Sequence, residues 1–126
     1  MSHYHAVVWV DAVEAHVIGF NRDEAEMALV HARAGSREVH QRVAGPSRDD
    51  AEFFRRIADA VRTSGEVLLV GPAATKLQLL KWWLVHDPAV AAKVVGVESA
   101  DHPADGQLLK HARQYFEAAD RMRPRG

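Results

Sequence analysis

The sequence of 126 residues contains no cysteine. Disulfide bonds, thiolate metal sites and a cysteine nucleophile are therefore excluded. No apolar run reaches the roughly 18–20 residues that a membrane-spanning helix needs. The first residues also lack the basic start of a signal peptide. We therefore expect a cytoplasmic protein that does not associate with a membrane.

Net charge is almost absent as well. The chain has 16 lysines and arginines against 17 aspartates and glutamates, a formal net charge of −1. A globally basic nucleic-acid-binding protein is not indicated, although a local basic patch is compatible with this balance. Hydrophobic residues make up 48% of the chain, which is typical of a globular protein. The length predicts a single α/β domain over 1–120, followed by a basic tail at 121–126.

Short apolar runs alternate with segments of helical spacing. Runs rich in β-branched and apolar residues predict strands at 5–11, 15–20, 26–31, 66–70 and 94–98. Helical spacing predicts helices over 48–64, 75–86 and 105–122, with a short turn at 89–92. Residues 26–31 also favour a helix by composition, but a strand completes a meander. Capping-box patterns at Ser47 and Thr75 mark two helix starts.

This order, βββαβα(α)βα, predicts a mixed β-sheet flanked by helices. The first three strands follow one another closely and favour antiparallel pairing. The later strand–helix–strand unit requires parallel pairing with a right-handed crossover.

The long loop at 32–47 is the strongest candidate for function. Loops of this length are uncommon in compact domains and are often functional. Four arginines and one glutamate give the loop and the residue after it a local charge of +3; the arginines are Arg33, Arg37, Arg42 and Arg48. Arginine suits phosphate recognition, so we predict that these four residues contact RNA. The alternative is a solvated loop that keeps the chain soluble.

A second candidate anion site lies at Gly71–Lys76, between a strand and a helix. Free backbone amides at such a position favour anions, and Lys76 is a candidate phosphate contact. The segment is not a P-loop, because the second glycine and the Lys-[Ser/Thr] pair are missing. The alternative assigns Thr75 to the helix cap and Lys76 to the solvated first turn.

Carboxylates at strand ends allow an enzymatic alternative. Asp11, Glu98 and Asp101, with Asp105 close by, are candidates to hold two Mg²⁺ ions in a nuclease. The structural alternative is that they form turns and helix caps. The eight histidines show no metal-binding spacing such as His-Glu-x-x-His, so no metal or other cofactor is predicted.

The adjacent Trp82 and Trp83 are the remaining unusual feature. Neighbouring helix positions point about 100° apart, so both rings are buried only where the helix is covered widely. We expect one of the two to be exposed in a contact surface, such as a homodimer interface.

Several segments resemble a known bacterial family. They are 5–11 (His-Ala-Val-Val-Trp-Val-Asp), 70–76 (Val-Gly-Pro-Ala-Ala-Thr-Lys), 94–98 (Val-Val-Gly-Val-Glu), 101–107 (Asp-His-Pro-Ala-Asp-Gly-Gln) and 112–116 (Ala-Arg-Gln-Tyr-Phe). The family is usually labelled "translational machinery protein", and it resembles the central domain of archaeal and eukaryotic class 1 release factors and of Pelota. The resemblance implies a ribonuclease H-like fold of the type found in translational machinery components.

The resemblance also bears on activity. In release factors, the loop that corresponds to 32–48 carries Gly-Gly-Gln, which promotes peptidyl-tRNA hydrolysis. This sequence has no Gly-Gly-Gln, and Gln41 has no preceding glycines. Pelota also lacks the tripeptide. We therefore predict a non-catalytic ribosome- or RNA-associated domain. The alternatives are a metal-dependent nuclease or ester hydrolase, and a dimeric protein-interaction module.

Overall fold

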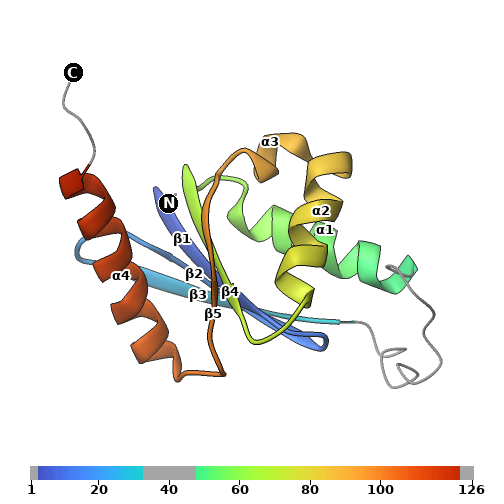
Figure 1. Cartoon of the computed structure of the whole chain (residues 1–126), viewed down its shortest axis with the longest axis horizontal. Coiled ribbons are helices and arrows are strands. Elements are labelled where there is room, and N and C mark those ends of the chain that lie inside the picture. Colours follow the sequence, from blue (N-terminus) through green and yellow to red (C-terminus); the bar gives the residue numbers. More distant parts are fainter. Residues whose placement is uncertain (1–2, 33–47, 123–126) are drawn as a thin grey trace.

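The computed structural model describes residues 3–32 and 48–122 of the chain (Figure 1). Its elements in order are β1 (His5–Val10), β2 (Glu14–Phe20), β3 (Ala25–His31), α1 (Arg48–Val61), β4 (Glu66–Gly71), α2 (Thr75–His86), α3 (Pro88–Ala91), β5 (Val94–Ser99) and α4 (Asp105–Met122). This order confirms the predicted one, including the strand preferred over a helix at 26–31.

The strands form one five-stranded mixed sheet in the order β3-β2-β1-β4-β5. β2 is antiparallel to both β1 and β3, whereas β4 is parallel to β1 and to β5. Asp11 and Asn21 form the two hairpin turns, because the Oδ1 atom of each accepts hydrogen bonds from backbone amides two and three residues further on. The mixed sheet predicted from the sequence is therefore confirmed.

Helices cover both faces of this sheet. α1 and α2 lie on one face and α4 on the other, as Figure 1 shows. The alternation of side chains along β1 explains the two layers: Ala6, Val8 and Val10 point toward α1 and α2, while Val7 and Trp9 point toward α4. None of the described helices combines the length and apolar character required to cross a bilayer.

One helix start differs from the sequence predictions. α2 begins after Ala74, and no side chain caps it, so the predicted capping box at Thr75 is wrong. The corresponding prediction at Ser47 lies outside the described residues. α4 ends at Met122, as predicted for the helix over 105–122.

The two tryptophans of α2 have different environments. Trp83 is fully buried, and its Nε1 donates a hydrogen bond to the Phe54 carbonyl at 3.1 Å. Trp82 is half-buried, with its ring stacked on His86 and the Arg55 guanidinium 5.5 Å from its centre. Trp83 therefore belongs to the core, and the contact surface predicted for one of the two rings stays a prediction for Trp82.

An ion pair links the end of α1 to the α2–α3 junction. Arg62 Nη2 lies 2.8 Å from Asp87 Oδ2 and 2.9 Å from Asp59 Oδ1. The hydrogen bond from Arg62 outweighs the effect of desolvation and holds the pKa of Asp87 below its ordinary value of 3.8. The ionised form of Asp87 therefore stabilises the folded chain.

We expect Asp87→Asn to lower the free energy of unfolding at pH 7. Under acidic conditions, we expect the variant and the wild type to become equally stable. A lowered folded-state pKa gives stability that is present above the unfolded value and lost as pH falls through the folded value. The stabilisation by ionised Asp87 is therefore lost below about pH 4. Urea denaturation of both proteins between pH 3 and 7 measures this loss. Asp59→Asn is the matched control, because it leaves the Asp87 contact intact; an equal loss in both variants contradicts the assignment.

Candidate functional site

Asp11, Lys76 and Asp101 lie in or near connections that follow the carboxyl ends of strands. β1, β4 and β5 run parallel, and β3 has the same direction because β2 is antiparallel to both β1 and β3. All four strands therefore end on the same side, here called the carboxyl edge, which is the lower edge in Figure 1. Ligands of open α/β sheets bind characteristically at this edge.

The basic segment begins at the carboxyl edge. The segment follows β3, which ends at His31, and it precedes α1, which begins at Arg48. Arg33, Arg37 and Arg42 lie outside the described residues. Their predicted contact with phosphate stays a prediction, and so does that of Arg48.

Lys76 has a different environment from the one predicted. Only 6% of the residue is exposed, and its Nζ donates a hydrogen bond to the Ala73 carbonyl at 2.7 Å. The ammonium group therefore stabilises the turn between β4 and α2. It does not present its charge to a phosphate, contrary to the prediction.

The three carboxylates proposed for a nuclease do not form a shared site. Asp11 shapes the β1–β2 turn, and Glu98 pairs with His111 at 2.6 Å. Asp101 is exposed, and its backbone carbonyl accepts a hydrogen bond from Trp9 Nε1. Among the described residues, only Glu14, His16 and His102 form a group of three with all ligand atoms within 4.8 Å of one another. The geometry therefore does not support the two-metal arrangement of Asp11, Glu98 and Asp101.

Glu14, His16 and His102 instead form a compact cluster, here called the His16 cluster. His16 Nε2 lies 2.9 Å from Glu14 Oε2 and 3.3 Å from His102 Nε2. His102 Nε2 lies 3.4 Å from the same Glu14 oxygen. The three atoms therefore form a nearly equilateral triangle at the carboxyl edge.

Neighbouring groups fix this cluster from two sides. On the outer side, His16 Nδ1 lies 2.9 Å from Oδ1 of Asp105, the first residue of α4. On the inner side, the Trp9 ring makes edge contacts with both histidines, 4.1 Å from His102 and 5.8 Å from His16 between ring centres. The bond from Trp9 to the Asp101 carbonyl holds the segment that carries His102.

The two carboxylates favour the protonated form of His16. Partial burial alone lowers the pKa of this imidazole, but its hydrogen bonds to Glu14 and Asp105 outweigh that effect, and the pKa is raised. The hydrogen bond from His16 lowers the pKa of Glu14 despite the opposing effect of burial. An ionised carboxylate only accepts hydrogen bonds, so His16 donates from both ring nitrogens when it is protonated.

The His16 cluster was not predicted from the sequence, because one of its three residues comes from a distant part of the chain. Glu14 and His16 are two positions apart on a strand and therefore share a face, which is a readable signal. His102, however, follows β5, and two other strands separate β5 from β2 in the sheet. His102 contacts Trp9 of β1 because of the path that the β5–α4 connection takes. The spacing of residues in the sequence does not predict that path.

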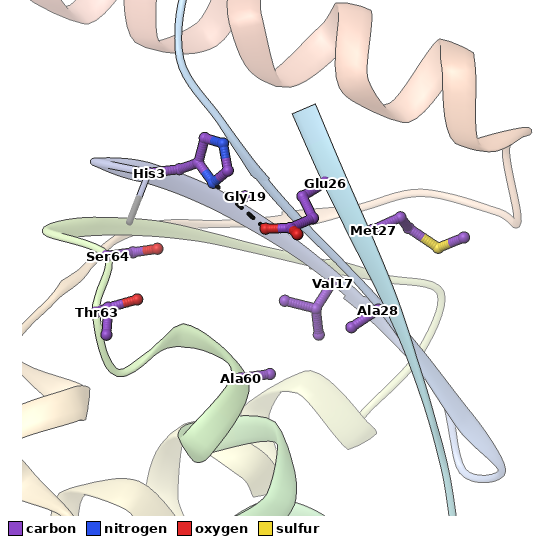
Figure 2. A pocket seen from close by; sticks show the side chains of 9 residues that line it. All are labelled: His3, Val17, Gly19, Glu26, Met27, Ala28, Ala60, Thr63 and Ser64. Carbon is purple, nitrogen blue, oxygen red and sulfur yellow. Dashed lines mark ion pairs between the residues drawn. The ribbon is translucent and has the colours of Figure 1, made fainter. Parts of the chain in front are cut away.

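A separate pocket lies near the opposite edge of the sheet. Figure 2 shows Val17 and Gly19 of β2, Glu26 and Ala28 of β3 and the 60–64 region around it. Its one drawn ion pair joins His3 Nδ1 to Glu26 Oε1 at 4.0 Å. None of the predicted site residues lines this pocket, so it is distinct from the carboxyl edge.

This chain is similar to known proteins in structure, but no similarity in sequence was found. No family model matches the chain, and no curated protein matches its sequence. Membership of the bacterial family therefore stays a prediction.

Several solved structures match the fold. Archaeoglobus fulgidus Pelota aligns with a TM-score of 0.64 at 13% identity, over 95% of this chain and 35% of that one. The archaeal translation termination factor aRF1 gives 0.54 at 12% identity, over 94% and 38%. Dom34 of S. cerevisiae, described as a translation termination-like factor, gives 0.54 at 11% identity, over 93% and 38%.

These alignments establish a shared fold. The present chain spans little more than a third of the length of each of these three proteins. The mixed five-stranded sheet flanked by helices is the arrangement of one part of Pelota, Dom34 and aRF1, as the resemblance implied.

Proposed function

We propose that this chain is a non-catalytic, ribosome-associated domain that contacts RNA phosphates through the arginines following β3. The observation that carries the proposal is the fold likeness to Pelota, aRF1 and Dom34, which extends over more than nine-tenths of this chain. Two of those proteins are described as termination or termination-like factors in translation.

The charge distribution supports the same proposal. The net charge of −1 gives no general attraction to RNA, so any attraction has to come from a local segment. Residues 32–48 carry four arginines against one glutamate, and they follow β3, which ends at the carboxyl edge. The absence of Gly-Gly-Gln from this segment supports binding without peptide release.

We expect the untagged protein to co-sediment with purified ribosomes, and the binding to weaken steeply with salt. Neutralising four phosphates releases counterions, which predicts roughly a 50- to 150-fold loss of affinity between about 50 and 200 mM salt. Glutamine replacements at all four arginines, Arg33, Arg37, Arg42 and Arg48, are expected to remove most of this binding.

The matched control carries the same change in charge elsewhere. It replaces four exposed basic residues by glutamine, namely Arg22, Lys81, Lys110 and Arg121. This control is expected to retain most of the binding. The proposal fails if the wild type stays in the supernatant at both salt concentrations, or if the four-arginine variant co-sediments as the wild type does.

A further inference from the structure

We propose that Glu14, His16 and His102 form a binding site for one divalent transition-metal ion of the zinc class. The ligand atoms are Glu14 Oε2, His16 Nε2 and His102 Nε2. This inference goes beyond the proposed function, and neither depends on the other.

The triangle of ligand atoms has the dimensions of a zinc site. Zinc binds imidazole nitrogen and carboxylate oxygen at about 2.0–2.2 Å, which places neighbouring ligands of a tetrahedral ion about 3.3–3.6 Å apart. The observed separations are 2.9, 3.3 and 3.4 Å. Widening the His16–Glu14 contact by a few tenths of an ångström therefore suffices to accommodate the ion.

The chemistry of the donors selects the type of metal. Two imidazoles and one carboxylate suit zinc, cobalt, nickel or iron, whereas Mg²⁺ and Ca²⁺ prefer all-oxygen sites. Three protein ligands also leave one coordination position for water or for a group from a partner. A cation placed here is balanced by the negative charges of Glu14 and Asp105.

The surroundings of His16 match those of a metal-bound histidine. Such a histidine donates its other ring N–H to a carboxylate, which fixes the tautomer and the orientation of the ring. Asp105 Oδ1 occupies that position, 2.9 Å from His16 Nδ1. Metal binding requires both Nε2 atoms to be free of protons, so the proton between His16 Nε2 and Glu14 goes to solvent, as does any proton on His102 Nε2, while the proton on His16 Nδ1 stays with Asp105. Trp9, which is 2% exposed, supplies an apolar wall behind both histidines.

The test uses the untagged, full-length protein after removal of metals with a chelator. Calorimetric titration with Zn²⁺ is expected to give one site per chain, and Co²⁺ is expected to give the intense visible absorption of tetrahedral coordination. His102→Gln is expected to lower the affinity by at least the roughly 10- to 100-fold that loss of an outer partner causes. Asp105→Ala, which removes that outer partner, is expected to lower the Zn²⁺ affinity by an amount within this range.

His111→Gln is the matched control, because its side chain is exposed to nearly the same extent as that of His102, 52% against 50%, and it pairs with Glu98 outside the cluster. It is expected to bind both ions as the wild type does. The inference is overturned if the wild type shows no stoichiometric Zn²⁺ binding. It is equally overturned if His102→Gln binds as tightly as the wild type, or if His111→Gln loses as much affinity.

Discussion

Replacing Trp83 by alanine is expected to lower the free energy of unfolding by about 3–5 kcal/mol. The side chain is fully buried between α2 and the sheet, so its removal loses the transfer free energy of a large ring and leaves a cavity. The substitution also removes the hydrogen bond from Nε1 to the Phe54 carbonyl, which ties α2 to α1. Small domains are stable by only about 5–15 kcal/mol, so this one residue accounts for a large share of the total. Urea denaturation of both proteins measures the difference.

Two further variants separate the causes. Trp82→Ala removes an equally large but half-buried ring from the neighbouring position, and we expect a loss of about 1 kcal/mol. Trp83→Phe keeps most of the packing and removes the N–H donor, so its expected cost is about 1–2 kcal/mol. If Trp83→Ala destabilises the chain no more than Trp82→Ala does, the assignment of Trp83 to the core is wrong.

The sequence predicted the helix that carries these two tryptophans, but it could not predict which of them is buried. Residues 75–86 have the composition of a helix, and the predicted range coincides with α2, although the predicted side-chain cap is not formed. Which face of that helix is buried depends on the partners that α1 and the sheet bring to it. Phe54, the partner of Trp83, is 29 residues away in the chain. Because the burial of Trp83 arises from tertiary packing, its helical position alone could not assign it.

Most of the strands, in contrast, could be predicted from local sequence. β1 and β4 are buried on both faces and consist of continuous apolar runs that are too short for helices. β3 is mostly exposed, and its sequence carries several good helix formers. Its assignment as a strand depended on the meander rather than on its own composition, and its pairing with all seven residues of β2 confirms that argument.

The sequence predicted site residues near the strand ends, but it did not predict which side chains converge there. Asp11, Lys76, Glu98 and Asp101 were predicted as site residues because they lie at strand ends or in the connections that follow them. In the structure, Lys76 and Asp11 serve the local turns. The groups that converge are Glu14, His16 and His102, and the bond that fixes the last of them joins residues 92 apart in sequence. Convergence over such a separation is a property of the folded chain.

Replacing Gly71 by alanine is expected to destabilise the fold by about 3 kcal/mol, toward the upper end of the usual cost of overpacking. A Cβ atom built on Gly71 lies 2.4 Å from the Val10 carbonyl oxygen on the adjacent strand. The neighbour is backbone rather than a flexible side chain, so relief requires β1 and β4 to separate where both end. The carbonyl of Gly71 also accepts the hydrogen bond from the Ala100 amide, which aligns the chain after β5. Any displacement therefore reaches the carboxyl edge.

Gly106→Ala provides a control of opposite sign. This glycine lies in the first turn of α4, and a Cβ atom there meets nothing within 4 Å. Alanine favours the helix over glycine, so we expect Gly106→Ala to stabilise the chain by up to about 1 kcal/mol. Thermal or urea denaturation of the two variants beside the wild type measures both changes. If Gly71→Ala is as stable as the wild type, then there is room for a Cβ atom at this position. That result contradicts the close approach of the Val10 carbonyl to Gly71.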